Sequence, residues 1–346
     1  MPTIMPAETH RHERTWMSFP TEGYVLGNTK ESRSEAIRMW SSVANAIVKY
    51  EPVSMVVDPA LESVAKDVLD DGVTTHPFPL NDCWMRDSGP TFVIDHGTNG
   101  ATTLKAVDWV FNGWGQQEWS AWDKDALLAR HVAEEAGVGV IDSSYVFEGG
   151  GFHVDGEGTA ILTETVALDP HRNPGRTRED IERELHRTLG VNKVIWLPRG
   201  LTRDYGEFGT RGHVDIVACM PQPGVVLFHD QRNPDHPDYQ VSRDIERVLS
   251  QARDARGRQL TVVPIPAPAQ GFEDDGTPTD FSYINHYAAN GAVIACTFND
   301  PNDDQAMTVL SQAYPGRTVV PISSKPLFDR GGGIHCITQQ QPALSE

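Results

Sequence analysis

Apolar residues in this chain follow two patterns that alternate along its length. Segments in which they recur every three to four positions predict amphipathic helices, and short continuous apolar runs predict buried strands. The helices are predicted at residues 30–49, 59–70, 122–136, 178–189, 242–255 and 303–313. The strands are predicted at residues 53–57, 73–77, 91–94, 104–111, 138–142, 159–162, 193–197, 260–265, 292–297 and 318–322. This alternation predicts an α/β fold, preceded by an irregular segment at residues 10–20.

Three histidines that follow glycines share one local form, namely Gly-Phe-His153-Val-Asp155, Gly-His213-Val-Asp215 and Gly-Ile-His335-Cys336. Each is predicted to stand at the start of a strand. The intervals from Asp87 through these histidines are 66, 60 and 122 residues, and the last is twice 61, with Asn285-His286 near the missing position. Such a period divides the chain into five units and predicts a propeller formed by one domain, residues 1–346. Loops from successive units are then expected to meet around one axis.

Composition narrows the classes of function. The formal charge of -19 opposes binding to nucleic-acid phosphates and anionic membranes, and it weakly favours encounter with a small cation. The four cysteines are scattered without close pairs, which is typical of a reducing, cytoplasmic setting. Residues 1–12 lack the apolar core of a signal peptide, and no run is long enough to span a membrane. The sequence leaves the oligomeric state open, a homo-oligomer included.

Cys336 is a candidate nucleophile. It follows Gly331-Gly332-Gly333, and residues 334–337 are predicted to form a short, half-buried strand. A free cysteine often serves only as a small buried hydrophobe. A nucleophilic thiol needs a nearby cation, which a positively charged planar substrate can supply, and such a substrate needs carboxylates. Asp87, Glu148 and Asp215 lie in the glycine-rich segments that are expected to converge.

A metal site is the alternative interpretation of the same segments. His-x-Asp occurs twice, and His153, Asp155, His213 and Asp215 together have the ligand chemistry of a metal centre. However, no pair of histidines has the spacing of ligands on one helix, and a thiol that acts as a nucleophile needs no metal. We therefore expect neither a metal nor another cofactor.

Four motifs in a fixed order resemble those of the agmatine deiminase family of guanidino-group hydrolases. They are Trp84-Met-Arg-Asp87-Ser-Gly-Pro-Thr-Phe92, Glu148-Gly-Gly, Gly212-His213-Val-Asp215 and Gly-Gly-Gly-Ile334-His335-Cys336-Ile-Thr-Gln-Gln-Gln-Pro342. Shorter matches to the family's sequence lie between these motifs, at residues 111–115, 172–174 and 282–285. The resemblance covers essentially the whole chain. It implies the pentein fold, a five-bladed α/β propeller of ββαβ units, and a small cationic guanidino compound as substrate.

The resemblance also implies a role for each matched residue. Cys336 would attack the guanidinium carbon, His213 would act as general acid and base, and Glu148 would orient that histidine. Asp87 and Asp215 would accept hydrogen bonds from the guanidinium. The default reaction is hydrolysis of agmatine to N-carbamoylputrescine and ammonia. The pocket residues assigned in this way are Trp84, Asp87, Trp114, Arg211, Asp215 and Gly333. His153, Asp155 and His335 are interpreted as structural.

The chain departs from the family pattern around the expected pocket for the substrate tail. The family carries an acidic residue and an Asn where this chain has Gly209 and Arg211, an Asn where it has Ile216, and another Asn at Gly333. Arg211 would repel an ammonium and bind a carboxylate, unless it serves in an internal salt bridge. Deimination of arginine or a guanidino acid is therefore the rival reaction. An amidinotransferase and a propeller that only binds guanidinium groups are further alternatives, and residues 111–122 are a candidate lid.

Overall fold

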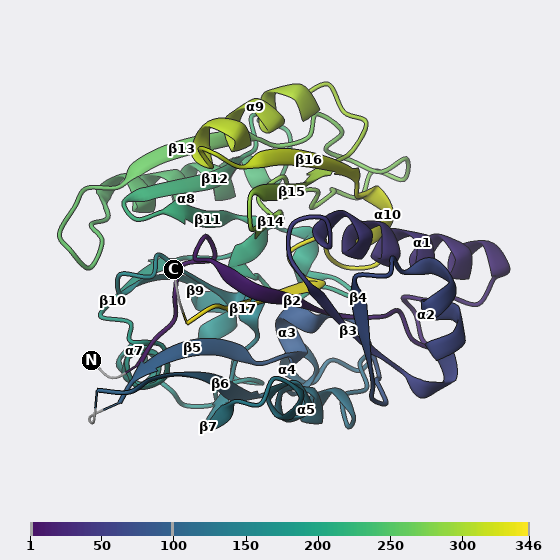
Figure 1. The fold of residues 1–346 in the computed structure, drawn as a ribbon. Coiled ribbons are helices and arrows are strands. Elements are labelled where there is room, and N and C mark those ends of the chain that lie inside the picture. Colours follow the sequence, from purple (N-terminus) through teal and green to yellow (C-terminus); the bar gives the residue numbers. More distant parts are fainter. Residues whose placement is uncertain (1–2, 98–99, 345–346) are drawn as a thin grey trace.

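The computed structural model describes residues 3–97 and 100–344, in which the strands form five small sheets (Figure 1). The first sheet contains β1 (Thr3–Ile4), β5 (Thr91–His96), β6 (Thr102–Val110) and β7 (Gly139–Val146), and the second contains β8 (Phe152–Val154), β9 (Thr159–Thr163) and β10 (Lys193–Leu197). The third contains β11 (Ala218–Gln222), β12 (Val225–Asp230) and β13 (Thr261–Pro266), and the fourth β14 (Tyr287–Ala289), β15 (Ala292–Thr297) and β16 (Thr318–Ser323). The fifth contains β17 (Thr338–Pro342), β2 (His12–Ser18), β3 (Val53–Val57) and β4 (Val73–Pro77).

Each sheet repeats one ββαβ pattern, which confirms the predicted architecture. In the fourth sheet, β14 and β15 pair antiparallel, and β16 returns parallel to β15 after helix α9 (Asp303–Ala313). A parallel return of this kind requires a crossover, and a helix supplies it. The corresponding helices of the first, second and third sheets are α5 (Leu128–Glu135), α7 (Arg178–Leu189) and α8 (Asp238–Gln251).

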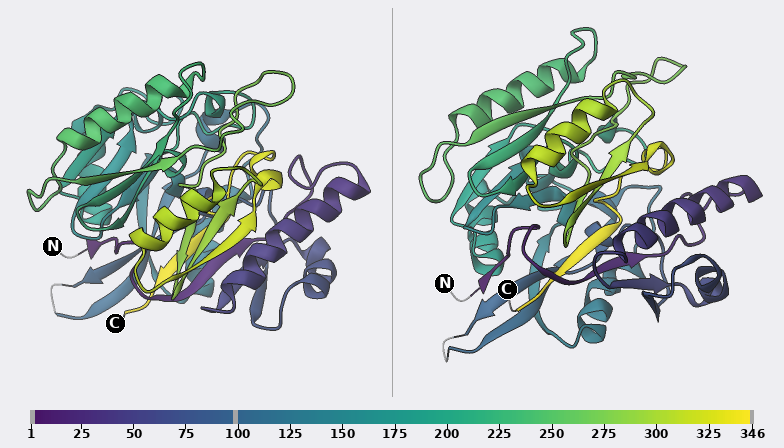
Figure 2. Two further views of the ribbon diagram at one scale, coloured as in Figure 1. Left: turned by 90° about the horizontal axis from the view of Figure 1, so that it is seen from above. Right: turned by 45° about the horizontal axis from the view of Figure 1, so that its top comes forward.

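The two ends of the chain close the ring of blades. In the fifth sheet β17 pairs antiparallel with β2, and β2 pairs parallel with β3 across helix α1 (Lys30–Ile47). Figure 2 shows the yellow C-terminal strand beside the purple N-terminal strand. Between these two strands, Trp16 Nε1 of β2 donates a hydrogen bond of 2.8 Å to Gln341 Oε1 of β17. The fifth blade therefore forms only when β17, from the end of the chain, pairs with β2, near its beginning.

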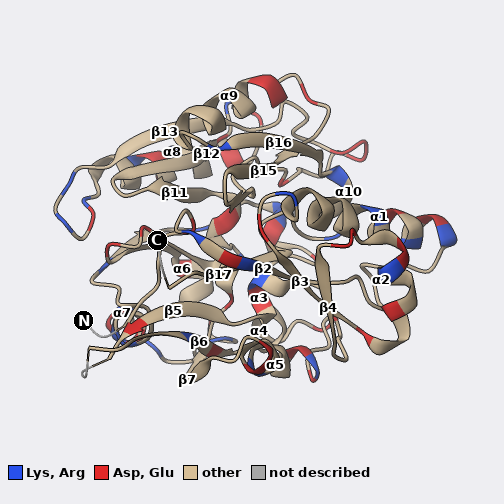
Figure 3. Ribbon diagram, viewed as in Figure 1, with Lys and Arg blue, Asp and Glu red and all other residues tan. Residues whose placement is uncertain are grey.

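Helix α1 illustrates how the sequence pattern becomes packing. Thr29 caps its first turn by accepting a hydrogen bond from the Ser32 amide, and its apolar face is buried in the main core. The buried positions on that face include Ala36, Trp40 and Val43. Figure 3 shows that acidic residues are spread over many elements and do not gather on one helix. In the part of the chain that the structure describes, no helix is both long and apolar enough to cross a membrane.

The structure corrects several local predictions. Residues 10–20 are not irregular, because His12–Ser18 forms the buried strand β2. The predicted helix at 59–70 is a 3-10 turn at Pro59–Leu61 followed by α2 (Glu62–Val68), and the strands β11 and β12 were missed. Residues 334–337 form a fully buried turn and not a half-buried strand, since Asn285 engages the His335 amide and Thr338 engages the Ile334 carbonyl.

Candidate active site

Five turns, each placed before the first strand of a blade, meet at one buried site. They are α3 (Met85–Ser88) before β5, η3 (Gly149–Gly151) before β8, η5 (Val214–Ile216) before β11, residues 282–286 before β14, and residues 334–337 before β17. In or beside these turns lie Asp87, Glu148, His213, Asp215, Asn285 and Cys336. The recurrence seen in the sequence is therefore a recurrence of these turns. His213 and His335 lie in turns, so the prediction that every such histidine starts a strand holds only for His153, in β8.

The thiol of Cys336 is buried beside a carboxylate and an amide. Its Sγ lies 3.3 Å from Asn285 Nδ2, which donates to it, and 3.5 Å from Asp215 Oδ2. The Cys336 carbonyl also accepts a hydrogen bond of 3.1 Å from the Arg86 amide, which fixes the turn. Burial, followed by the charges of Asp215 and Asp87, raises the pKa of Cys336 well above its ordinary value. The thiol is therefore neutral in these surroundings, and a positive charge beside it would favour the thiolate.

His213 lies between two carboxylates. Its Nε2 is 3.3 Å from Glu148 Oε2, and its Nδ1 is 3.8 Å from Asp87 Oδ1. Burial alone would lower the pKa of His213, but Asp87 and Glu148 outweigh burial and raise that pKa to about 9. The imidazole is thus protonated at neutral pH and can act as an acid.

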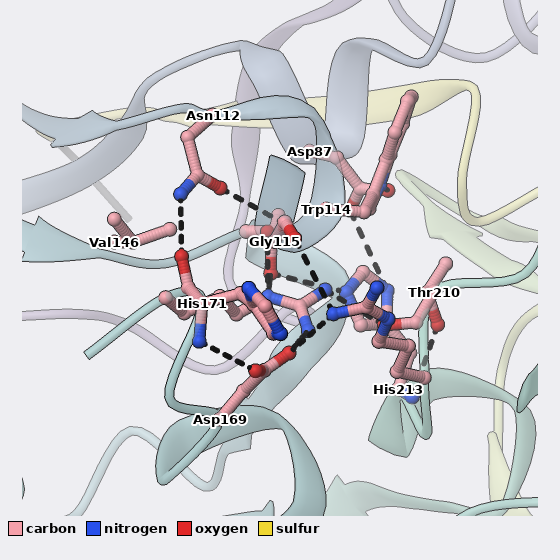
Figure 4. A network of polar contacts seen from close by, with 12 residues as sticks. Asp87, Asn112, Trp114, Gly115, Val146, Asp169, His171, Thr210 and His213 are labelled. Atoms are coloured by element: carbon pink, nitrogen blue, oxygen red, sulfur yellow. Dashed lines mark hydrogen bonds and ion pairs between the residues drawn. The ribbon is translucent and has the colours of Figure 1, made fainter. Parts of the chain in front are cut away.

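Arg172 fixes Glu148. Its Nε lies 2.9 Å from Glu148 Oε1, its Nη1 lies 3.0 Å from Asp169 Oδ2, and its Nη2 donates to the Thr210 carbonyl at 2.7 Å. Burial alone would raise the pKa of Glu148, but Arg172 and His213 hold it at about 2. Figure 4 shows the surrounding network, in which Asp169 and Thr210 lie below the labelled Asp87, Trp114 and Gly115. The sequence gave only a weak indication that Arg172 belongs to the site, namely the short match to the family at residues 172–174.

Asp87 is held from two sides. Its Oδ1 accepts from the Gly150 amide at 3.1 Å, and its Oδ2 accepts from Trp114 Nε1 at 2.9 Å. A Cβ atom on Gly150 would lie 2.6 Å from His213 Nδ1 and 2.9 Å from carboxylate oxygens of Asp87 and Asp215, so only glycine fits at this crossing. Burial raises the pKa of Asp87 to about 6, partly opposed by His213.

Two buried atoms of the site lack partners within the described residues. Asp215 Oδ2 accepts from His335 Nδ1 at 2.9 Å, whereas Asp215 Oδ1 and His213 Nδ1 have no hydrogen bond. Burial raises the pKa of Asp215, but the hydrogen bond and charge of His335 lower it overall, so Asp215 is an anion. A buried carboxylate oxygen without a donor is costly, which points to a ligand that brings N–H groups.

Aromatic residues cover the thiol and form the upper part of the pocket. The pocket beside Cys336 is lined by Tyr24, Trp84, Asp87, Trp114, Trp119, Phe208, Thr210 and Gly331. Tyr24 stacks on Phe208 with ring centroids 4.6 Å apart, and Trp114 stacks on Trp119 at 5.2 Å. Trp114 and Phe208 have φ angles of 54° and 63°, a left-handed conformation that is costly for large side chains. Such strain is typical of residues held in place for binding.

Some of the predicted pocket residues line the pocket, and others make contacts outside it. Trp84 and Trp114 line the pocket with Asp87 and Cys336. Arg211 Nη1 lies 3.3 Å from Asp169 Oδ2 and 3.3 Å from the Gly115 carbonyl, the internal salt bridge that was the alternative to a tail contact. Gly333 packs on Asn285, because a Cβ atom there would lie 2.4 Å from Asn285 Oδ1.

The two His-x-Asp motifs serve different purposes. Asp155 accepts from the amides of Glu157 and Thr159 and thereby closes the turn between β8 and β9. His153 faces Glu8 and not His213. Among the residues that the structure describes, no three His, Cys, Asp or Glu side chains are arranged to hold a metal ion. The groups present can instead bind a planar cation, position its central carbon near a thiol and protonate a leaving group.

Comparisons with known proteins fit this geometry. The profile of the Porphyromonas-type peptidyl-arginine deiminase family matches residues 4–342. An agmatine deiminase of Medicago truncatula is 38% identical over 98% of this chain and 96% of its own length. The structure of an agmatine deiminase of Enterococcus faecalis superposes with a TM-score of 0.90 at 32% identity, covering 99% of this chain and 96% of that chain. A DDAH of Pseudomonas aeruginosa in complex with citrulline shares only the pentein fold, with a TM-score of 0.50 at 13% identity, covering 95% of this chain and 99% of that chain.

Proposed function

The chain belongs to the Porphyromonas-type peptidyl-arginine deiminase family, and on that premise we propose that it hydrolyses agmatine to N-carbamoylputrescine and ammonia. The observation that carries the proposal is a buried carboxylate oxygen without a hydrogen-bond donor, Asp215 Oδ1, in a site that also holds Asp87, His213 and Cys336. A guanidinium presents N–H donors in one plane, which suits carboxylates on two sides of a flat cation. The substrate's own charge also supplies the cation that the thiol lacks.

The first half of the reaction uses Cys336 as nucleophile. The bound guanidinium lowers the pKa of the thiol, which loses its proton to solvent, and the resulting thiolate attacks the guanidinium carbon to form a C–S bond. The imidazolium of His213 then donates its proton to the departing nitrogen, the C–N bond breaks, and ammonia leaves. The product of this half is an amidino-thioether on Cys336. Glu148 stabilises the proton-bearing form of His213 throughout.

The second half returns the thiol. His213, now neutral, removes a proton from water as the water oxygen attacks the amidino carbon. The C–S bond breaks, the oxygen passes its remaining proton to the departing sulfur and becomes the ureido carbonyl, and Cys336 is again a thiol. The two halves together consume one water and release one ammonia, and they require no cofactor.

Charged residues beyond the pocket support a substrate whose tail is a cation. The charge of Arg211 is engaged by Asp169, so this residue does not present a free cation for a carboxylate. A second space shares Phe208 and Gly331 with the pocket, and its other lining residues are Arg203, Glu207, Gly209, Asp280, Phe328 and Asp329. Burial raises the pKa of Asp280 to about 7 and Lys325 engages Asp329, so the charge of Glu207 is the one that favours the ammonium of agmatine over the carboxylate of a guanidino acid.

A panel of guanidino compounds tests this proposal. Agmatine, arginine and a guanidino acid are each incubated with the protein, and ammonia release is measured with Cys336→Ser as the blank. We expect agmatine to have the highest kcat/KM, and a Cys336 adduct to be trapped by mass spectrometry. Preference for the guanidino acid would overturn the assignment of the tail. Product that forms only with an added acceptor amine would indicate an amidinotransferase, and binding without turnover would contradict catalysis.

A further inference from the structure

A second buried network lies beneath the thiol, and it contains a residue from the beginning of the chain. Glu8 precedes β2 and is only 8% exposed. Its Oε1 lies 2.8 Å from His335 Nε2 and 3.6 Å from Arg86 Nη1, and its Oε2 lies 3.5 Å from His153 Nε2. Nothing in the sequence pattern marked Glu8, and the reaction described above does not use it.

The protonation of this network follows from its contacts. His153 Nδ1 accepts a hydrogen bond from the Met220 amide, so His153 Nε2 carries the proton and donates to Glu8. Arg86 can only donate. Because Arg86 and His153 approach its two oxygens as donors, Glu8 is an acceptor and therefore an anion. Burial opposes this charge, but His335, His153 and Arg86 lower the pKa of Glu8 well below its ordinary value.

His335 lies between two acceptors. Its Nε2 faces Glu8 Oε1 at 2.8 Å, and its Nδ1 faces Asp215 Oδ2 at 2.9 Å. A neutral imidazole has one N–H group, so both contacts are hydrogen bonds to carboxylates only when the ring is an imidazolium. The other titratable groups around this ring are Arg86, His153, His286, Cys219, Tyr314 and Cys336. Among these other groups Arg86 opposes the imidazolium, whereas the two carboxylates, Glu8 and Asp215, favour it.

This imidazolium reaches the reaction centre through Asp215. The Asp215 oxygen that accepts from His335 is also 3.5 Å from Cys336 Sγ, and the other oxygen is unpartnered. We propose that Glu8 is a positioning residue: by accepting the Nε2 proton of His335 it keeps that ring an imidazolium, which holds Asp215 ionised with one oxygen free for the guanidinium. The inference concerns the same site as the proposed function and rests on it for the role of Asp215.

The test compares the substrate-free protein with Glu8→Gln. Both are labelled with ¹⁵N-histidine, and the ring-nitrogen shifts of His335 are followed between about pH 6 and pH 9, a range that brackets the ordinary histidine pKa. The His335 signals are assigned by their loss in His335→Asn. We expect His335 to keep imidazolium shifts to a higher pH in the wild-type protein than in Glu8→Gln. For agmatine, Glu8→Gln should raise KM about tenfold and lower kcat less, the equivalent of one weakened charged hydrogen bond.

Glu51→Gln is the matched control. Glu51 is equally buried and binds His12 Nδ1 at 3.0 Å, but it touches none of the active-site residues. This variant should lose stability, as Glu8→Gln does, and leave the His335 shifts and KM unchanged. Glu8→Asp keeps the charge and should retain the imidazolium.

Several outcomes overturn the inference. A neutral His335 in the wild-type protein contradicts it, as does an unchanged imidazolium in Glu8→Gln, and the first of these needs no variant to fold. Equal effects of Glu8→Gln and Glu51→Gln on the His335 shifts would reduce Glu8 to a structural role. Because the NMR measurement uses no substrate, it can succeed even if the protein fails to deiminate agmatine, so the two proposals fail separately.

Discussion

The lower and upper parts of the pocket are constructed differently. The lower part, formed by Asp87, Glu148, His213, Asp215, Asn285 and Cys336, comes from five turns in equivalent positions of the five blades. The upper part, formed by Tyr24, Trp114, Trp119 and Phe208, comes from loops that have no such relation. The lower part is held by backbone turns and ion pairs, the upper part by aromatic contacts and left-handed backbone.

Under the proposed function, the lower part carries out the reaction and the upper part selects the substrate. Groups on equivalent turns have fixed positions relative to the ring axis, so a reaction that needs sub-ångström placement belongs there. Aromatic loops can change length and sequence without disturbing the blades, so they suit discrimination among substrates. The upper part is nonetheless tied together, because Gln117 Nε2 donates to the Gly209 carbonyl and Trp84 Nε1 donates to Tyr24. Mutations in the lower part should therefore act mainly on kcat, and those in the upper part mainly on KM.

The largest effect is expected from Cys336→Ser in the lower part. A serine hydroxyl is far less ionised than a thiol, so kcat for agmatine should fall by at least about 10⁴-fold, with binding retained. Ammonia release and isothermal calorimetry measure the two quantities. Cys296→Ser is the matched control, since that buried cysteine lies in β15 and its Sγ donates to the Asn285 carbonyl, a bond that serine can keep. A Cys336→Ser protein with more than about one hundredth of wild-type kcat would show that the thiol is not the nucleophile.

Arg172→Met tests whether the lower part depends on residues behind it. Without the guanidinium, burial raises the pKa of Glu148 and the partner of His213 loses its orientation. We expect kcat to fall about 100-fold, with the acidic limb of the kcat profile moved to higher pH. Arg172→Lys should recover part of the loss. Rate measurements across pH provide the readout, and an unchanged acidic limb would contradict the role given to Arg172.

The charge of His213 should make stability depend on pH. Its pKa is raised from an ordinary value of about 6.5 to about 9, so the stabilisation that it provides is complete below about pH 6.5 and is lost as the pH rises through about 9. The corresponding free energy is on the order of 3 kcal/mol. The Tm of the wild-type protein should therefore exceed that of His213→Asn by less at high pH. A Tm difference that stays constant between these limits would contradict the raised pKa.

Phe208→Ala tests the upper part. Removing a ring that stacks on Tyr24 should raise KM for agmatine by about tenfold and change kcat little, since the ring lies away from the reacting atoms. Phe272→Ala is the control, because Phe272 is an exposed phenylalanine that packs on His236, outside the pocket. A large loss of kcat in Phe208→Ala would contradict the expectation that the upper part affects mainly KM.

The smallest effect is expected from Arg211→Asn. Because Asp169 already engages this arginine, the ratio of kcat/KM for agmatine and for a guanidino acid should change by less than about threefold. The substrate panel measures this ratio for both proteins. A change of more than about tenfold in this ratio would show that Arg211 contacts the substrate tail.

The sequence by itself determined the repeat, and it predicted the reacting groups of the proposed function. Glycine-led motifs at nearly constant spacing predict five units, and ordered motifs around Asp87, Glu148, His213 and Cys336 predict one site. These features are local, because each depends on a few adjacent residues and on a turn that recurs in every blade. Even Asn285 had a weak signal, since it lies near the missing fourth position of the repeat.

Only the tertiary structure decided which residues hold those groups in place. Arg172 meets Glu148, Arg211 meets Asp169, and Glu8 meets His335 across 327 residues. Ring closure, in which β17 pairs with β2, sets the last of these contacts, whereas Arg172 and Arg211 meet partners that lie 24 and 42 residues away in the chain. A contact between segments far apart in the chain leaves no periodic trace in either segment, because its geometry depends on the packing of all five blades.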